Sequence, residues 1–280
     1  MIFTVAAAFI FVLGLVVGSF LNCVVYRLKE KKSFVSGRSF CPRCKHNLAW
    51  YDLVPVFSFI FLRGKCRYCN KPISWQYPTV EICTGCIFLL IFNFQFSIFN
   101  FSSFAGSRVA GQFFTPDSLI GLVYLFVIAS LLIIIFIFDL KWYLIPDKVL
   151  LWAVGITAAF HLYSFAFNFY PKGQISNFLF SAFGAAGFFL AIFLLTRGKA
   201  MGFGDVKLAF FMGLFLGWPK IVTALFLAFL IGAIIGLILI INKKKQMKSE
   251  IPFGPFLITG LFIALFWGKA IINFYLNFFV

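Results

Sequence analysis

Two aspartates set in apolar sequence, Asp139 and Asp205, are the residues of this chain best suited to chemistry. Asp139 ends an apolar run, and Asp205 closes the segment Met201-Gly202-Phe203-Gly204-Asp205. The 280 residues include only 8 Asp and Glu, and an ionisable group at membrane depth costs about 2.5–3.5 kcal/mol. Two carboxylates that share a proton can activate water and protonate a leaving amine. The pair therefore predicts hydrolysis of the aspartic-protease type.

Each aspartate has a purely structural explanation when taken alone. Asp139 could be an interfacial residue paired with Lys141, and Asp205 could cap the helix that follows it. The pairing favours chemistry, because both residues fall at the same depth on the ends of different apolar runs. Gly202 and Gly204 would let backbones approach closely and leave room for an extended substrate. We expect Asp139 to hold the shared proton more often, since a helix N-terminus stabilises an anion and a helix C-terminus disfavours one.

Two further acidic residues are predicted to support this site. Asp147 follows Ile145-Pro146, where it would cap the next helix. Glu81 lies one turn into the second apolar run, and a buried membrane glutamate is functional by default, so we expect it to support the site or to contact substrate. The remaining acidic residues are predicted to be solvent-exposed: Asp52, Glu30, Glu250 and Asp117.

Two Cys-x2-Cys pairs, Cys41/Cys44 and Cys66/Cys69, form a second candidate site. Four thiolates satisfy tetrahedral Zn²⁺, and each pair can bend over one side of the ion. Neighbouring basic residues would favour the thiolate form and offset the negative charge of a filled site: Arg43, Lys45, Lys65 and Arg67. Disulfides are disfavoured in the cytoplasm. Structural zinc is therefore the preferred interpretation, with redox chemistry and unmetallated thiols as alternatives.

The other cysteines and both histidines are predicted to have no chemical role. His46 stands beside the first pair, but four thiolates already suffice, so we expect a surface imidazole. Cys23, Cys83 and Cys86 fall in apolar runs and are expected to pack as small hydrophobic residues. His161 has no nearby carboxylate in sequence, and we expect it to pack between helices.

Composition identifies the elements that must position these residues. Hydrophobic residues make up 62% of the chain and charged residues 11%, whereas soluble domains carry about 25% charged residues. The sequence therefore predicts an all-α polytopic membrane protein with seven or eight transmembrane helices. Runs long enough to span a bilayer, about 20 residues each, fall at 3–26, 77–97, 118–138, 148–168, 176–195, 220–241 and 253–278. A shorter run at 206–217 is a further span or a re-entrant piece. The first run is too long for a signal peptide, so we expect it to be retained.

The runs divide the chain into a first transmembrane helix at 1–26, a cytoplasmic four-cysteine module at 27–76 and a transmembrane peptidase domain at 77–280. A module of about 50 residues is too small to bury a core unaided, which again favours a bound metal. The net charge of +16 comes from basic residues that gather in alternate loops, and it does not indicate a nucleic-acid partner. The positive-inside rule places 27–76 in the cytoplasm and the N-terminus outside, with anionic lipid as the neighbour of the basic loops. An eighth span makes this alternation self-consistent.

Taken together, the motifs resemble those of the bacterial type IV prepilin leader peptidases, the bifunctional peptidase/N-methyltransferase family of GxGD membrane aspartic proteases. The resemblance runs nearly end to end, and its motifs in chain order are Gly18-Ser19-Phe20-Leu21-Asn22, Tyr26-Arg27-Leu28, Cys41-Pro42-Arg43-Cys44, Asp52-Leu53-Val54-Pro55, Leu62-Arg63-Gly64-Lys65-Cys66-Arg67-Tyr68-Cys69, Ile73-Ser74, Tyr77-Pro78-Thr79-Val80-Glu81, Asp139, Ile145-Pro146-Asp147, Gly202-Phe203-Gly204-Asp205-Val206-Lys207-Leu208 and Pro252-Phe253-Gly254-Pro255-Phe256. One departure is visible, because Gln76 stands where the family leads us to expect Arg.

The resemblance implies a concrete activity in the bacterial inner membrane. Family members cut the short basic leader from type IV prepilins and from the pseudopilins of type II secretion, on the cytoplasmic face. They then N-methylate the new N-terminus with S-adenosyl-L-methionine. Asp139 and Asp205 match the family's catalytic pair, and the cysteine module is tied to the methyltransferase half. No glycine-rich nucleotide loop is present, so the sequence does not place the S-adenosyl-L-methionine site.

Two other classes of protein share some of these features. An ion- or proton-coupled transporter also keeps carboxylates in the membrane, but it predicts them near the bilayer midplane, with interrupted helices in both halves. A membrane thiol oxidoreductase would use the Cys-x2-Cys pairs, but it requires them on the oxidising side of the membrane. The topology predicted from the charges places the two aspartates at the cytoplasmic face instead of the midplane. It places the Cys-x2-Cys pairs in the cytoplasm, opposite to the oxidising side.

Overall fold

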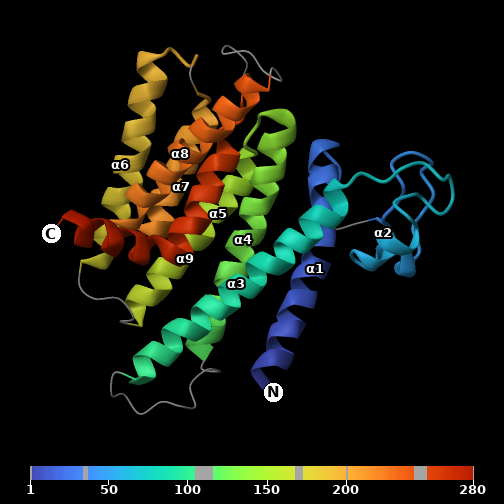
Figure 1. The fold of residues 1–280 in the computed structure, drawn as a ribbon, viewed down its shortest axis with the longest axis horizontal. Helices are drawn as coiled ribbons and strands as arrows, with labels where there is room; N and C mark the ends of the chain where they lie inside the picture. The colour runs from blue at the N-terminus through green and yellow to red at the C-terminus, as the bar shows by residue number, and fades with distance from the viewer. Residues whose placement is uncertain are drawn as a thin grey trace. The chain divides into compact units, whose positions relative to one another are not determined.

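The computed structural model describes residues 2–33, 37–104, 116–167, 173–199, 201–242 and 251–279. Every regular element in these ranges is a helix, accompanied by two isolated β-bridges, Phe40–Asn47 and Lys65–Pro72. The helices are α1 (Ile2–Lys29), η1 (Trp50–Leu53), α2 (Phe57–Phe61), α3 (Gln76–Phe104), α4 (Pro116–Trp142), α5 (Asp147–Ala166), α6 (Gln174–Leu195), α7 (Phe203–Leu216), α8 (Lys220–Ile241) and α9 (Gly254–Phe279) (Figure 1). The predicted all-α fold is confirmed. The basic run at 243–248 and Glu250 lie outside the described residues.

Seven of the described helices are long and apolar enough to cross a membrane: α1, α3, α4, α5, α6, α8 and α9. Their bounds agree with the predicted spans to within a few residues, apart from the ends of α3 and α4, which extend further. The single shorter run, predicted at 206–217, forms α7, whose 14 residues rise about 21 Å, less than the bilayer's hydrocarbon core of about 30 Å. On length alone α7 is therefore not counted among the spans.

The chain divides into two compact units, Met1–Ile134 and Ile135–Val280, with the division inside α4. In unit 1, α1 and α3 cross at a contact made of glycines (Figure 1). A Cβ on Gly14 would lie 2.7 Å from the Cα of Gly85, and a Cβ on Gly18 would lie 2.7 Å from the Cα of Glu81. Small residues four apart let two membrane helices touch through their backbones, which is how these long helices hold together in lipid.

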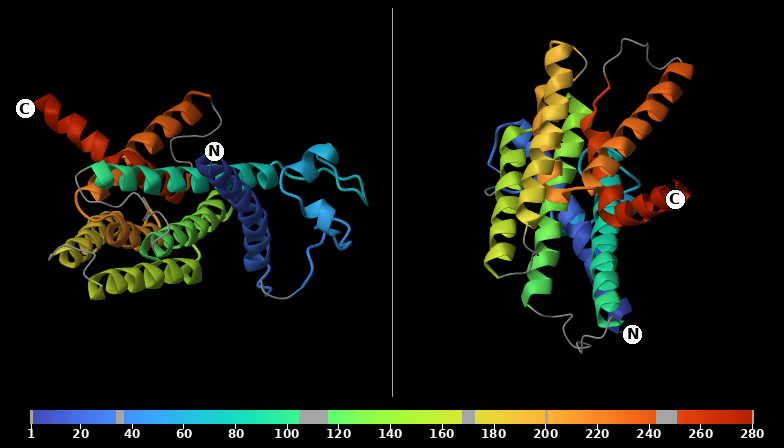
Figure 2. Two further views of the ribbon diagram at one scale, coloured as in Figure 1. Left: turned by 90° about the horizontal axis from the view of Figure 1, so that it is seen from below. Right: turned by 90° about the vertical axis from the view of Figure 1, so that its left-hand side faces the viewer.

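Unit 2 is built around α7. The side chains of Leu208, Ala209, Phe211 and Met212 have no exposed surface, so this short helix forms the core of the unit. The longer α6 lies along it, and a Cβ on Gly213 of α7 would clash with the α6 backbone. The α6 and α7 ribbons run beside each other in the right-hand view of Figure 2.

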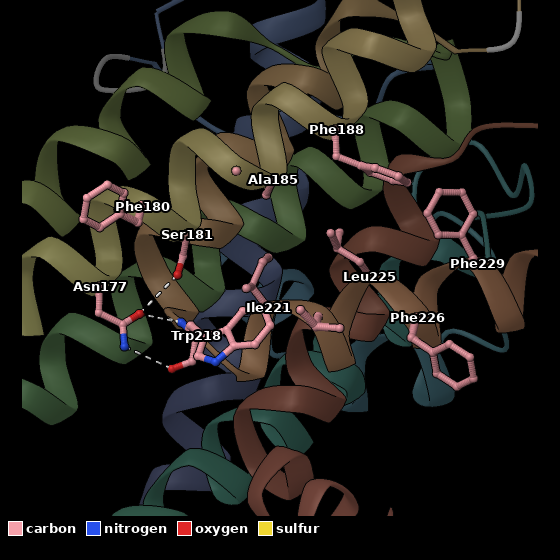
Figure 3. A pocket seen from close by; sticks show the side chains of 12 residues that line it. Asn177, Phe180, Ser181, Ala185, Phe188, Trp218, Ile221, Leu225, Phe226 and Phe229 are labelled. Carbon is pink, nitrogen blue, oxygen red and sulfur yellow. Dashed lines mark hydrogen bonds between the residues drawn. The ribbon is translucent and has the colours of Figure 1, made fainter.

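α7 connects opposite ends of unit 2 in spite of its length. At its end, the Trp218 N–H donates to Asn177 Oδ1 at 2.8 Å, and the Asn177 amide donates to the Trp218 carbonyl at 3.2 Å (Figure 3). Asn177 belongs to the first turn of α6, whereas Phe203 at the start of α7 packs on Phe193 near the end of α6. α7 and the two residues after it, Gly217 and Trp218, therefore lie along α6 from near its end to its first turn. Beside them, an apolar groove of about 740 Å³ lies between α6 and α8 (Figure 3).

Candidate active site and candidate metal centre

Asp139 lies in the last turn of α4, which continues to Trp142. Its side chain is buried, and its Oδ2 atom accepts a hydrogen bond from the Gly254 N–H at 2.9 Å. Gly254 is the first residue of α9, where backbone N–H groups have no partner within the helix. The next residue, Pro255, has no N–H at all, so the Gly254 N–H is the free donor nearest the start of this helix.

Gly254 is a site residue to which sequence reasoning assigned no role. A Cβ at this position would lie 2.6 Å from Asp139 Oδ2, so a side chain here would collide with the carboxylate. The signal was present in the sequence, because Pro252-Phe253-Gly254-Pro255 places a glycine and a proline at the start of an apolar run. What the sequence does not contain is the partner, 115 residues earlier in the chain.

Asp205 is the third residue of α7 and is also buried. Its Oδ2 atom accepts a hydrogen bond from the Gly202 N–H at 3.3 Å, so it reaches back to the N-cap residue instead of being the N-cap itself. A Cβ on Gly204 would lie 3.2 Å from the Ile145 side chain, a tight contact that explains this glycine. A Cβ on Gly202 would meet only ordinary contacts at 3.9 Å, so close packing does not require glycine there.

The two aspartates lie in the same unit, close enough for the charge of Asp139 to act on Asp205. Each uses Oδ2 for its backbone hydrogen bond, and neither Oδ1 atom has a hydrogen-bond partner among the described residues. No fully buried polar side-chain atom in that part of the chain is left without a partner. Both Oδ1 atoms are therefore accessible, and the pair presents two open carboxylate oxygens held from behind by backbone N–H groups.

The structure does not support the reasoning by which Asp139 was predicted to hold the shared proton more often than Asp205. That reasoning assumed that Asp139 stands at a helix C-terminus while Asp205 stands at a helix N-terminus. In the structure α4 continues past Asp139, and the carboxylate of Asp139 also accepts an N–H at the start of α9. Both carboxylates thus face the positive end of a helix dipole. The order of protonation stays a prediction without a structural argument for it.

Asp147 is the first residue of α5, and Pro146 occupies the N-cap position. The prediction that Asp147 caps this helix is wrong, because its side chain makes no capping hydrogen bond. Its Oδ1 atom instead pairs with Lys207 Nζ at 2.7 Å, two residues beyond Asp205. The carboxylate is 70% exposed, and ion pairs in such positions contribute about 0–1 kcal/mol. Asp147 therefore contacts α7 near the site without belonging to the buried pair.

Glu81 belongs to unit 1, apart from the unit that holds the aspartates. It is buried in α3, and its Oε2 atom accepts a hydrogen bond from the Val56 N–H at 2.7 Å. Val56 precedes α2 and has a φ of 61°, a region that β-branched residues rarely adopt. Glu81 therefore fixes a strained turn of the cysteine module onto α3.

The four cysteines of the module converge. The sulfur atoms of Cys41, Cys44, Cys66 and Cys69 all lie within 4.8 Å of one another. Four sulfurs placed about 2.3 Å from a zinc ion stand roughly 3.8 Å apart, so the cluster needs little adjustment to hold a metal ion. The structure thus brings together the metal ligands predicted from the sequence.

Two similar hairpins bring the sulfurs together. In the first, the Cys41 N–H donates to the His46 carbonyl at 2.9 Å, and in the second the Cys66 N–H donates to the Lys71 carbonyl at 2.9 Å. Burial raises the pKa of both thiols, but at Cys41 hydrogen bonds from the Cys44 and Arg43 backbone outweigh it and lower the pKa to about 7. A thiol that ionises near neutral pH is suited to metal binding.

Asp52 was predicted to be solvent-exposed, and this prediction is wrong. Its side chain is 3% exposed and accepts hydrogen bonds from Arg67 Nε at 2.8 Å and from the Tyr68 hydroxyl at 3.2 Å. The ring of His46 stacks on Tyr68, with the ring centroids 3.7 Å apart. Asp52 therefore ties the segment between the hairpins to the second hairpin, and His46 joins the first hairpin to the second.

Gln76 and Asn22 join α3 to α1 at the edge of the module. The Gln76 side-chain amide donates to Asn22 Oδ1 at 3.2 Å, and the Asn22 amide donates to the Tyr77 carbonyl at 3.2 Å. His161 is buried and its Nε2 atom lies 2.9 Å from the Leu214 carbonyl oxygen, so its predicted role in helix packing is confirmed.

The fold and these sites define a multi-pass membrane protein with a buried carboxylate pair and a four-thiol cluster. Residues 12–94 match the family described as Bacterial Peptidase A24 N-terminal domain, and residues 126–237 match the Type IV leader peptidase family. The chain therefore belongs to the type IV leader peptidase family.

Curated relatives cover nearly the whole chain. It is 31% identical to a prepilin leader peptidase/N-methyltransferase of Bacillus subtilis (strain 168), over 96% of this chain and 97% of the relative. It is also 31% identical to proteins of the same name from Aeromonas salmonicida (strain A449), over 96% and 93%, and from Legionella pneumophila, over 95% and 92%. No solved structure matches the chain.

Proposed function

We propose that this protein is an aspartic endopeptidase of the bacterial inner membrane that removes the leader from type IV prepilins or pseudopilins. Asp139 and Asp205 are its catalytic pair. The observation that carries the proposal is the buried pair itself, with each Oδ2 held by a backbone N–H and each Oδ1 accessible. Family membership and the names of the relatives supply the substrate class.

The geometry suits general acid–base hydrolysis. One carboxylate takes a proton from a water molecule, and the oxygen of that water attacks the carbonyl carbon of the scissile peptide bond. The other carboxyl group is protonated and gives its proton to the departing amine as the C–N bond breaks. The net reaction consumes one water and restores one shared proton to the pair. The backbone bonds to Gly254 and Gly202 keep both carboxylates in place throughout these steps.

The relatives' names also indicate a second activity, methylation of the new N-terminal amine. We propose that S-adenosyl-L-methionine is the methyl donor, which when bound supplies a methyl group on an electrophilic sulfonium. The convergent sulfurs of the cysteine module fit a structural zinc ion, held by Cys41, Cys44, Cys66 and Cys69. We further propose that the basic module at 27–76 lies in the cytoplasm and the N-terminus outside, following the positive-inside rule.

The two alternative classes fit the site less well. A transporter needs carboxylates that line a path near the bilayer midplane, whereas Asp139 and Asp205 stand in the last turn of α4 and the first turn of α7. A thiol oxidoreductase needs a dithiol pair that cycles alone, whereas here four sulfurs converge on one point.

The decisive experiment is a membrane assay of leader removal from a candidate prepilin. Asp139→Asn and Asp205→Asn keep the side-chain size and remove the charge, so we expect leader removal to fall by at least about 1,000-fold in each. Asp147→Asn is the matched control, because it makes the same change at an exposed carboxylate of the same unit. Cleavage at near wild-type rate by either variant of the pair would exclude the two-aspartate mechanism.

A further inference from the structure

The cysteine module exposes an apolar helix face that a domain surrounded by water would not carry. Phe57, Ile60 and Phe61 of α2 are 57%, 62% and 81% exposed. Spacings of three and four residues place these three side chains on one side of the helix, and Phe59 lies on the other side. Soluble proteins rarely expose bulky apolar side chains next to one another, and such a patch marks an interaction surface. This surface, which we call the α2 face, must therefore meet a partner.

Two contacts fix the depth of α2 along α3. The Val56 N–H, at the N-cap of α2, donates to Glu81 Oε2 at 2.7 Å, and the Phe59 ring packs on Trp75 with the ring centroids 4.9 Å apart. Trp75 directly precedes α3, and Glu81 lies about 7.5 Å along this helix from its first residue, because each helical residue rises about 1.5 Å. The span that α3 can form begins at Gln76. α2 is therefore tied to the segment where α3 enters the bilayer.

The charges beside the α2 face fit a lipid partner. The segment 27–76 holds 11 basic and 2 acidic residues, and Arg63 and Lys65, which follow α2 closely, are exposed. Basic side chains of this kind lay their stems on apolar surface and extend their charges toward anionic headgroups. A second copy of the chain, seated face to face on the same surface, would bring these like charges together, where they repel. Lipid is therefore the partner that both the depth and the charge favour.

We propose that the α2 face inserts into the bilayer interface, between the headgroups and the first acyl carbons, with anionic headgroups around Arg63 and Lys65. Helices with one apolar face bury that face about 5–10 Å into this boundary, where tryptophan is also enriched, and Trp75 is 74% exposed at the start of the span. Insertion restrains the module from swinging about the end of α3. The proposal goes beyond leader removal, because it depends only on α3 being a span.

Tryptophan fluorescence of the full chain in lipid nanodiscs of phosphatidylethanolamine and phosphatidylglycerol tests this directly. Ile60→Trp and Phe61→Trp each place a new indole on the α2 face, and its signal is the emission that the variant adds to that of the wild-type protein. The matched control is Asn47→Trp, at an exposed position of the first hairpin, where no large apolar side chain of residues 40–47 is exposed.

Lipids brominated near the headgroup end of their acyl chains quench an indole in the interface, whereas acrylamide quenches an indole in water. We expect brominated lipid to quench the added emission of Ile60→Trp and Phe61→Trp at least about threefold more strongly than that of Asn47→Trp, because the α2 face is inserted. Acrylamide should show the reverse order, with the added emission of Asn47→Trp quenched about threefold more strongly than that of the two variants.

Zinc content and leader removal are measured on the same samples and should match the wild type, because no cysteine and no aspartate is changed. Quenching of both new indoles by acrylamide as strongly as in Asn47→Trp would overturn the proposal, since the α2 face would then stand in water. Protection from both quenchers would also overturn it, because unit 2 or a second copy of the chain would then cover the face. Loss of zinc in both variants would show that the face packs against protein, with the same consequence.

Discussion

Substituting Gly254 by alanine should disable leader removal although neither catalytic residue is replaced. The new Cβ would stand 2.6 Å from Asp139 Oδ2, whereas ordinary contact begins at 3.4 Å. The carboxylate or the start of α9 must therefore move by about 0.8 Å, which also disturbs the 2.9 Å hydrogen bond that holds Asp139. A displacement of this size in a catalytic group costs about 100-fold in rate, or roughly 2.7 kcal/mol of transition-state stabilisation.

A graded series of glycine substitutions makes the assay specific. A Cβ on Gly204 would lie 3.2 Å from Ile145, a side chain that can yield by a few tenths of an ångström, so Gly204→Ala should lose about tenfold or less. A Cβ on Gly187 of α6 would meet nothing within 4 Å, so Gly187→Ala is the control for alanine in a helix of the same unit. The loss in Gly254→Ala should appear in kcat with little change in KM, because the substrate itself is not contacted.

The measurement is a time course of leader removal at saturating and subsaturating prepilin, on variants matched for expression and thermal unfolding. Gly254→Ala activity within twofold of wild type would show that the backbone N–H of residue 254 does not hold the carboxylate in its working position. An equal loss in Gly187→Ala would show that the effect comes from general destabilisation of unit 2. The order Gly254, Gly204, Gly187, from most to least damaging, is the result that the Cβ distances require.

Three further outcomes follow from the other contacts. Cys44→Ser should reduce zinc per protein, measured by elemental analysis, from about one to near zero and lower the thermal midpoint, because three thiols do not close a tetrahedral site; a full zinc complement would contradict the ligand assignment. Asp147→Asn and Lys207→Met should each change the unfolding free energy by less than about 1 kcal/mol, because the ion pair is exposed; a larger loss in a chemical or thermal melt would mean that the pair has a further role. Gly14→Leu should destabilise unit 1 severely, since a Cβ there would lie 2.7 Å from the α3 backbone, whereas Val12→Leu, on an exposed part of α1, should be neutral in the same melt.

The elements of the fold were predictable because lipid imposes a single rule. A span needs about 20 apolar residues with its backbone hydrogen bonds made internally, so helices can be counted from apolar runs alone. α7 is the exception for the same reason. It is surrounded by other helices, as the fully buried Leu208 and Phe211 show, so its length is set by the packing of its neighbours and not by the bilayer.

Local motifs were also predictable where the chemistry lies within a few residues. The paired spacing of the cysteines predicted their convergence, because each pair is a hairpin closed by its own backbone. The contacts of Asp52 and Gly254 were missed because their partners are distant in sequence. The residues around Asp52 predict an exposed loop aspartate, but Arg67 and Tyr68 donate hydrogen bonds to it in the folded chain. The residues around Gly254 predict only the start of a helix, but its N–H donates to Asp139.

The domain boundaries at 26 and 76 remain predictions. The compact units divide elsewhere, inside α4, and α1 packs on α3 within the first of them. Charge patterning locates loops, and it carries no information about which helices pack together. The packing of α1 on α3 depends on glycines such as Gly14, Gly18 and Gly85. The sequence shows these glycines but does not show which helix each of them contacts.

The three buried carboxylates in the described part of the chain, Asp139, Asp205 and Glu81, are each held by a backbone N–H at the start of a helix and not by an ion pair. Asp139 accepts a hydrogen bond from the N–H of the first residue of α9, Asp205 from the N-cap of α7 and Glu81 from the N-cap of α2. Asp52 also accepts an N–H from the N-cap of η1, but it is paired with Arg67 as well. None of these three carboxylates has an ion-pair partner among the described residues, whereas a helix start carries backbone N–H groups without partners. Such a donor holds a carboxylate without adding a mobile charge beside it. At Asp139 and Asp205 this leaves one oxygen of each pair member open for water, which an arginine partner gripping both oxygens would have blocked.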